Sequence, residues 1–263
     1  MTVTWRREGD AGLVELANPP VNAMGLAVRQ GLLDAVRWAE NEPGLSRVIV
    51  SGQGRAFAAG GDAREFDGDP VPPHLPDVLD AIEASTVPWI AAAHGVALGG
   101  GAELMLACRY RIAAPDTKIG LPEVTLGVVP GAGGTQRLPR LVGLDTALDM
   151  IANGKPVGAL DAQEMGLVDA VADDPVGIVV DQAGAQFDHR ARCAATLVVR
   201  FEAADVDGQV VVGRDVAAGP RDPDDVMRRF LLDRAGERAA DGTTAADYDR
   251  GGALCASLGH LIH

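Results

Sequence analysis

The sequence contains 263 residues, carries a formal net charge of −14, and is 47% hydrophobic by residue count. This length suffices for one large domain, or for a domain with an appendage, around a sizeable core. The acidic balance, without any run of Lys or Arg, argues against a surface that binds nucleic acid. A local cluster such as Arg55 and Arg64 can still receive an anionic small molecule.

The three cysteines, Cys108, Cys193 and Cys255, are widely spaced and form no C-x-x-C pair. This pattern favours a reducing compartment and argues against a disulfide or a metal site. Residues 1–7 lack the basic and apolar pattern of a signal peptide, so we expect a cytoplasmic protein.

The first third of the chain predicts strands and helices in alternation. Two β-type runs around a turn predict an opening hairpin, and a strand-helix-strand unit after them favours parallel pairing. The predicted elements are strands at Val3–Trp5, Leu13–Leu16, Val48–Val50 and Val87–Ala93, helices at Leu26–Glu40 and Asp77–Ala84, and a surface loop at Asp67–Pro76.

The central stretch Val96–Glu103 predicts a strand end that turns through three glycines into a helix starting near Gly100. The first amides of a helix have no internal partner and lie at the positive end of its dipole, so they can bind an anion or a developing oxyanion. Glu103, one turn into the helix, then stands beside that site. The alternative is a structural glycine turn with a solvated Glu.

The apolar stretch Val87–Ala107 is about long enough to cross a bilayer by residue count. It contains His94, Glu103 and several glycines, and a carboxylate in lipid is unfavourable. We therefore interpret it as a core strand, turn and helix, and we expect no membrane association.

The remainder of the chain predicts further short elements and then changes in character. Beyond about Ala172 the sequence shows helical patterns separated by a polar segment, which predicts a core over residues 1–172 and a helical C-terminal region over residues 173–263. The predicted elements before that boundary are strands at Tyr110–Ala113, Thr117–Leu121 and Leu167–Val171, a glycine loop at Val129–Arg137, and helices at Leu144–Asn153 and Gly158–Met165; after it, helical patterns cover Val176–Ala195 and Asp224–Ala240.

Several familiar sites are excluded by spacing. The sequence has no G-x-G-x-x-G between a strand and a helix, no complete phosphate-binding loop and no G-x-S-x-G nucleophile motif. Apart from the pair at the C-terminus, its histidines show no metal-ligand spacing, and we expect His94 to be a packed or hydrogen-bonding residue. A dehydrogenase activity is therefore not expected in this chain.

Three blocks of sequence resemble the enoyl-CoA hydratase/isomerase, or crotonase, family in their order and spacing. The blocks are Arg55–Asp62, His94–Glu103, and Gly120–Glu123 with Leu126–Leu138, and the resemblance covers roughly residues 14–171. Two stretches, Asn18–Ala23 and Gly131–Leu138, are also similar to the hydratase part of bifunctional enoyl-CoA hydratase/3-hydroxyacyl-CoA dehydrogenases.

The resemblance implies an α/β fold made of a spiral of stacked ββα units with a C-terminal helical region, usually assembled as a homotrimer or hexamer. It implies that the amides of Gly61 and Gly100 form an oxyanion hole and that Glu103 and Glu123 are the catalytic carboxylates. The substrate is an acyl-CoA thioester, and no metal or other cofactor is implied. The residues expected along the substrate path are Ala59, Gly61, Asp62, Ala63, Arg64 and Gly100.

The chemistry of enoyl-CoA hydration, within fatty-acid or related acyl-CoA degradation, explains these residue types. Addition of water to the double bond places negative charge on the thioester oxygen, which two fixed amides stabilise. We interpret Glu103 as the base that activates water, because a helix dipole favours its carboxylate. We interpret Glu123 as the acid that protonates Cα, because burial in an apolar setting raises a carboxyl pKa.

Two alternatives stay open at the level of sequence. One is a double-bond isomerase, or another enzyme of this family that stabilises a thioester enolate. The other is a non-catalytic acyl-CoA-binding subunit, against which the presence of both glutamates speaks. Two features depart from the family pattern: Gly61 stands where alanine is common, and the chain from about Ala191 onward does not follow the pattern.

Overall fold

The computed structural model describes residues 1–62, 65 and 69–180. The chain divides into two units, Met1–Leu197 and Val198–His263, and every described residue belongs to the first. The predicted helical patterns beyond residue 180, including Asp224–Ala240, therefore lie outside the described residues. Ala63 and Arg64, two of the residues expected along the substrate path, lie outside them as well.

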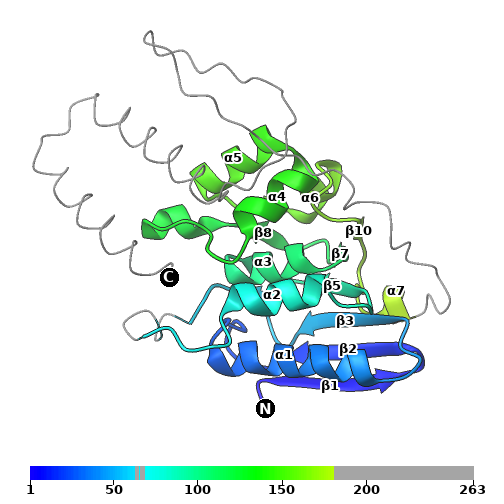
Figure 1. The fold of residues 1–263 in the computed structure, drawn as a ribbon. Helices are drawn as coiled ribbons and strands as arrows, with labels where there is room; N and C mark the ends of the chain where they lie inside the picture. The colour runs from blue at the N-terminus through cyan, green and yellow to red at the C-terminus, as the bar shows by residue number, and fades with distance from the viewer. Residues whose placement is uncertain (63–64, 66–68, 181–263) are drawn as a thin grey trace, which may run out of the picture. The chain divides into compact units, whose positions relative to one another are not determined.

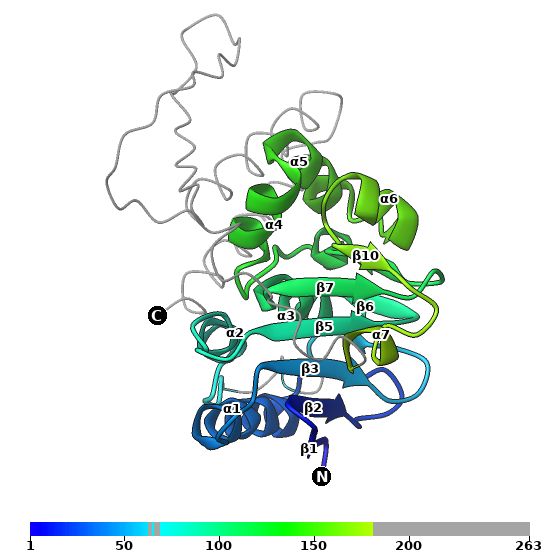
Figure 2. The same cartoon turned by 90° about the vertical axis from the view of Figure 1, so that its right-hand side faces the viewer.

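Two β-sheets form the frame of the described unit. The larger has six strands in the order β1-β2-β3-β5-β7-β10, and the smaller has four in the order β4-β6-β8-β9. Figure 2 shows strands of the larger sheet side by side. Only the outer pairs β1–β2 and β8–β9 are antiparallel among the described strands.

The chain winds between the two sheets in repeated turns. Each turn places one strand in the larger sheet and the next in the smaller, and then continues into a helix. The predicted spiral of stacked ββα units is confirmed. The three turns are β3 (Arg47–Gly52), β4 (Ala58–Ala59) and α2 (Leu75–Glu83); β5 (Trp89–Ala93), β6 (Val96–Leu98) and α3 (Gly100–Ala107); and β7 (Tyr110–Ala113), β8 (Lys118–Gly120) and the 3₁₀ helix η2 (Pro122–Leu126).

The opening of the chain follows the predicted order. Strands β1 (Val3–Glu8) and β2 (Ala11–Leu16) form an antiparallel hairpin, and β2 then pairs in parallel with β3. Helix α1 (Leu26–Asn41) connects β2 to β3 in the sequence. It buries an apolar stripe that includes Leu32, Val36 and Ala39 at helical spacing. Figure 1 shows α1 lying along these first strands.

Helix α2 begins earlier than predicted. Its first residue is Leu75 rather than Asp77, and Pro76 lies in its first turn. Proline is tolerated there because the first amides of a helix have no acceptor within the helix. The predicted loop at 67–76 is correspondingly shorter at its C-terminal end.

The apolar stretch at residues 87–107 forms β5, β6 and α3, as predicted. All eight residues of α3 are buried, and β5 is buried along its whole length, which explains their nearly continuous hydrophobicity. Within the described residues, no helix combines the length and the apolar character needed to cross a membrane.

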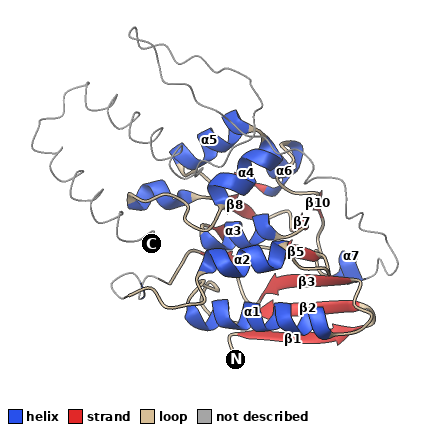
Figure 3. Cartoon of the chain, viewed as in Figure 1, coloured by secondary structure: helices blue, strands red, loops and turns tan. Residues whose placement is uncertain are grey.

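After η2 the structure is mainly helical, as Figure 3 shows in blue. Helices α4 and α5 pack against each other, and α6 follows a short strand that pairs with β8. The elements are α4 (Gly134–Val142), α5 (Leu144–Asn153), β9 (Val157–Gly158), α6 (Ala159–Glu164), β10 (Ala170–Val171) and α7 (Gly177–Val180).

The last described residues pack onto the larger sheet. Val176, Val179 and Val180 lie against a cluster of apolar side chains from β2, β3, β5 and β7. The buried guanidinium of Arg47 donates hydrogen bonds to the carbonyl oxygens of Val179 and Val180, each over 3.1 Å. The described core thus extends past the predicted boundary at residue 172 to Val180; the predicted division of the chain there stays a prediction.

Candidate active site

The parallel register of the smaller sheet brings the glycine turns together. Ala58 and Ala59 of β4 pair with Ala97 and Leu98 of β6, so the segments that leave these two strands emerge at the same edge. The Gly60 amide donates to the Leu98 carbonyl over 2.8 Å, and the Gly99 amide donates to the Gly120 carbonyl over 3.0 Å. Residues 60–61, 99–100 and 120–123 are therefore neighbours in space.

Gly60 and Gly99 take backbone conformations that favour glycine, with φ of +70° and +53°. A side chain at Gly99 would also crowd Glu123, because an ideal Cβ there lies 3.2 Å from Glu123 Oε1. The turns can therefore approach each other closely, and Gly61 and Gly100 follow directly after these two glycines. Helix α3 begins at Gly100, as predicted.

Glu103 is 3% exposed and lies in the first turn of α3. Its Oε1 atom accepts hydrogen bonds from the Ala132 amide over 2.7 Å and the Gly134 amide over 2.9 Å. Gly134 is also the first residue of α4. The carboxylate thus lies at the N-terminal ends of two helices, and both the amides and the dipoles stabilise a negative charge there.

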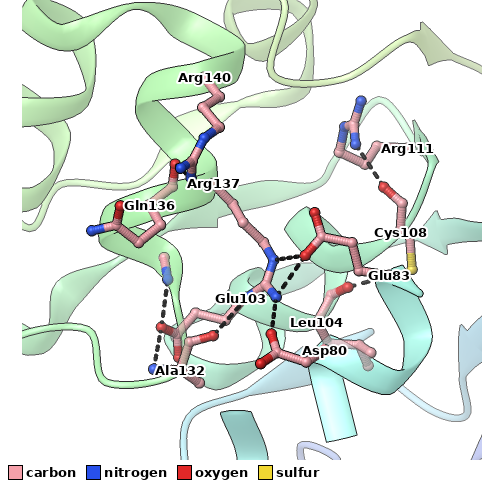
Figure 4. Close-up of polar contacts among 11 residues, drawn as sticks. Asp80, Glu83, Glu103, Leu104, Cys108, Arg111, Ala132, Gln136, Arg137 and Arg140 are labelled. Atoms are coloured by element: carbon pink, nitrogen blue, oxygen red, sulfur yellow. Dashed lines mark hydrogen bonds and ion pairs between the residues drawn. The ribbon is translucent and has the colours of Figure 1, made fainter. Parts of the chain in front are cut away.

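Arg137 supports the loop that binds Glu103. Its guanidinium is 9% exposed, pairs with Asp80 at 2.6 Å and Glu83 at 2.8 Å on α2, and donates to the Ala132 carbonyl over 2.9 Å. Figure 4 shows Arg137 reaching from α4 toward the two carboxylates, with Glu103 and Ala132 beside it. The residue whose amide contacts Glu103 is therefore fixed through its own carbonyl by Arg137.

Glu123 lies at the start of η2, next to Gly99. Desolvation by burial, with a further contribution from the charge of Glu103, raises the pKa of Glu123 from 4.5 to about 7. Its Oε2 atom is buried and has no hydrogen-bond partner among the described residues. The direction of this pKa shift agrees with the one expected from the sequence.

The other residues expected along the substrate path fall into two groups. Ala59 and Gly61 lie at the glycine turns, whereas Asp62 lines a hollow of about 570 Å³ beside the start of α1. Glu103 and Glu123 do not line this hollow. Its lining residues are Asn18, Gly25, Leu26, Ala27, Val28, Gln30, Asp62, Glu65 and Pro72.

His94 lies outside this group of residues. Its Nε2 atom is 2.9 Å from the Gly54 carbonyl oxygen, which agrees with the hydrogen-bonding role expected for it. Among the described residues, no group of three or more His, Cys, Asp or Glu side chains is placed to hold a metal ion.

Sequence reasoning did not assign a role to Ala132, Gly134 or Arg137, although all three lie in a quoted block. Ala132 and Gly134 act through backbone amides, so their residue types reveal nothing about Glu103. One feature of the sequence could have indicated Arg137, because it is a cation on a helix that otherwise buries small and apolar residues. Its carboxylate partners lie 54 and 57 positions earlier, so the local sequence does not identify them.

The family model for enoyl-CoA hydratase/isomerase matches residues 7–204 of the chain. Among curated proteins, the peroxisomal bifunctional enzyme of Danio rerio is 49% identical over 161 residues, which are 61% of this chain and 22% of the relative. The chain therefore spans about a fifth of that bifunctional relative. The probable enoyl-CoA hydratase of Bacillus subtilis is 40% identical over 174 residues, 64% of this chain and 67% of the relative.

Solved structures give the same result for the fold. The crystal structure of enoyl-CoA hydratase from Bacillus anthracis superposes with a TM-score of 0.64 and 35% sequence identity, covering 70% of this chain and 74% of that one. The comparison agrees with the spiral of ββα turns described above.

Proposed function

Because the chain belongs to the enoyl-CoA hydratase/isomerase family, we propose that it is a 2-enoyl-CoA hydratase. It adds water across the α,β double bond of an enoyl-CoA thioester and gives a 3-hydroxyacyl-CoA, in fatty-acid or related acyl-CoA degradation. The observation that carries this proposal is the pair of carboxyl groups beside the glycine turns: Glu103 with two amide donors, and Glu123 with a pKa raised to about 7.

The amides of Gly61 and Gly100 bind the thioester carbonyl oxygen. Attack of water on Cβ moves the electrons of the double bond toward that oxygen, which becomes an enolate oxyanion. One such donor is worth about 3 to 4 kcal/mol of transition-state stabilisation in other enzymes. The close approach of the two turns, in which an ideal Cβ on Gly99 would lie 3.4 Å from the Gly60 Cα, supports a shared position for both donors.

The two carboxyl groups divide the proton transfers. Glu103 accepts a proton from the attacking water as its oxygen bonds to Cβ, and protonated Glu123 gives its proton to Cα as the enolate collapses. Glu103 is then neutral and Glu123 ionised, so one proton must return between them before the next turnover.

The acyl-CoA is the substrate, and the proposed chemistry needs no further cofactor. We place Ala59, Gly61, Asp62, Ala63, Arg64 and Gly100 along its path, with Gly61 and Gly100 at the reacting thioester. A homotrimer or hexamer is the proposed assembly, which light scattering coupled to size-exclusion chromatography tests. The cytoplasmic location expected from the sequence stays a prediction.

The test follows loss of the conjugated enoyl-thioester absorbance with crotonyl-CoA. Wild type should consume the substrate, and Glu103→Gln and Glu123→Gln should each lower kcat by about 10² to 10⁴-fold, because each removes one proton transfer. Glu164→Gln, on the exposed face of α6, is the matched control and should keep full activity.

Two outcomes contradict the proposal. Near-wild-type activity in both site variants would show that neither carboxylate takes part. A folded wild type that binds CoA thioesters and leaves crotonyl-CoA intact would instead point to an isomerase, which a 3-enoyl-CoA substrate detects, or to a non-catalytic binding subunit.

A further inference from the structure

Each of the two proposed oxyanion donors belongs to a peptide unit whose carbonyl oxygen accepts a hydrogen bond from another backbone amide. A trans peptide is planar, so its N–H and C=O point in opposite directions and a hydrogen bond to the oxygen orients the N–H. The Gly99 carbonyl, in the same peptide as the Gly100 amide, accepts from the Glu103 amide over 2.9 Å. The α3 helix therefore fixes the Gly100 donor by its own first turn.

The Gly61 donor is held, among the described residues, by a contact from a different segment of the chain. The Gly60 carbonyl, in the same peptide as the Gly61 amide, accepts from the Met24 amide over 3.0 Å. Met24 is buried, with 1% of its surface exposed, and it precedes α1 by two residues. The direction of the Gly61 N–H consequently depends on what holds Met24.

Arg29, on the first turns of α1, holds Met24 from the other side. Its Nη1 atom donates to the Met24 carbonyl over 3.0 Å and pairs with Glu65 Oε2 at 2.7 Å. The same guanidinium donates to the carbonyls of Pro73 over 2.8 Å and Val71 over 3.2 Å. One 11%-exposed side chain thus ties the start of α1 to three backbone carbonyls and a carboxylate.

Glu65 completes this arrangement at the N-terminus of α1. Gly25, the N-cap residue, provides no side-chain hydrogen bond, and Glu65 Oε1 instead accepts from the Leu26 amide over 2.6 Å. A carboxylate at this end of a helix is stabilised by the unpaired amides and by the dipole. Glu65 therefore fixes Arg29 and the helix start to each other.

We propose that Arg29 is a positioning residue of the oxyanion hole, acting through Met24 and the Gly60–Gly61 peptide to aim the Gly61 N–H at the thioester oxygen. This inference rests on the proposed function. The two N–H groups are then oriented by different parts of the structure. Helix α3 itself orients the Gly100 N–H, whereas a buried guanidinium outside the carboxylate site orients the Gly61 N–H.

The test compares Arg29→Met with a matched control, Arg47→Met. Arg47 is also a buried arginine that pairs with a half-exposed carboxylate, Asp10 at 3.0 Å, and donates to two backbone carbonyls. Its hydrogen bonds within the described part of the chain go to Asp10, Ser46, Val179 and Val180, away from the glycine turns. Both variants remove a buried guanidinium and leave carbonyls without their donor. A loss of activity in Arg29→Met that is absent from Arg47→Met then reports on the position of the Gly61 N–H rather than on general stability.

Two readouts are measured on protein shown to be folded by circular dichroism. The first is kcat and KM with crotonyl-CoA, where Arg29→Met should lower kcat by about 10-fold or more with little change in KM, because the lost interaction matters mainly in the transition state. The second is the infrared stretch of a ¹³C-labelled thioester carbonyl in bound butyryl-CoA, which cannot be hydrated. Hydrogen bonds to the carbonyl lower its frequency.

Wild type and Arg47→Met should show the same lowered carbonyl frequency, and Arg29→Met should show a frequency shifted toward that of free butyryl-CoA. If Arg29→Met does not fold, Arg29→Gln replaces it with the same expectations. A wild-type kcat and carbonyl frequency in the folded Arg29 variant would overturn the inference. A wild type without a lowered frequency and without hydration would instead overturn the proposed function on which it rests.

Discussion

The Glu103 carboxylate accepts a hydrogen bond from the Gly134 amide over 2.9 Å, and an ideal Cβ on Gly134 would lie 3.0 Å from the same oxygen. The site therefore brings the backbone of α4 against a carboxylate on α3, with no room for a side chain between them. Backbone amides of the loop and of α4 therefore contribute to the position of Glu103, and Gly134 is sensitive to the smallest substitution.

We expect Gly134→Ala to displace the Glu103 carboxylate and to lower kcat for crotonyl-CoA hydration by about 10- to 100-fold, because small misplacements of a catalytic group reduce rates strongly. The substitution should not weaken α4, since alanine is the better helix former. Gly131→Ala is the control in the same loop, because a Cβ there meets nothing within 4 Å. Equal steady-state activity of the two variants would contradict this prediction.

The raised pKa of Glu123 predicts how the rate depends on pH. Glu123 must be protonated to serve as the acid, and its pKa is about 7. We expect kcat/KM for hydration to fall above about pH 7, with a slope of −1 on a logarithmic plot, because this ratio reports groups of the free enzyme. The residual activity of Glu123→Gln should lack that decline. A wild-type profile that stays flat to pH 9 would exclude Glu123 as the acid.

The same shift makes folding stability depend on pH. Folded Glu123 holds its proton up to about pH 7, whereas the unfolded chain releases it near the ordinary value of 4.5. The stabilisation from this group is therefore fully present below pH 4.5 and is lost as the pH rises through 7. Urea unfolding at pH 4.5, 6 and 8 should show wild type losing stability relative to Glu123→Gln as the pH increases. An unchanged difference between the two proteins would count against a buried Glu123.

Arg137 should matter for both stability and rate. Removing it leaves Asp80 and Glu83 free to be hydrated, since their side chains are 72% and 49% exposed, but it leaves the Ala132 carbonyl without this donor. We expect Arg137→Met to lower the free energy of unfolding by about 1 to 3 kcal/mol. It should also lower kcat, because the Ala132 amide binds Glu103.

Arg140→Met is the control for this prediction. Arg140 is exposed on the same helix, and its guanidinium donates a hydrogen bond to the carbonyl of Gln136, one turn earlier (Figure 4). Chemical denaturation and steady-state kinetics of both variants measure the difference. A kcat for Arg137→Met equal to that of Arg140→Met would show that the loop keeps its position without the guanidinium.

Local patterns in the sequence were sufficient to predict most of the described elements. The hairpin, the helix from Leu26, the glycine turn into α3 and the helix over Leu144–Asn153 follow from periodicity and from turn residues, which act over a few positions. The start of α2 differs from the prediction because Pro76, which is typical of a loop, is also tolerated in the first turn of a helix. The resemblance to a family also indicated Glu103 and Glu123 as the catalytic carboxylates.

The surroundings of those two glutamates were decided by the tertiary structure. Glu103 takes its amide donors from residues 29 and 31 positions later, and Arg29 reaches carbonyls as far away as Pro73. The glycine turns meet because β4 and β6 pair in one register. Sequence by itself determined which segments form strands, turns and helices, since that depends on neighbouring residues. The partners of Glu103, Arg137 and Arg29 were fixed only when distant segments packed, because burial leaves each charged group dependent on whichever donors or acceptors the fold places beside it.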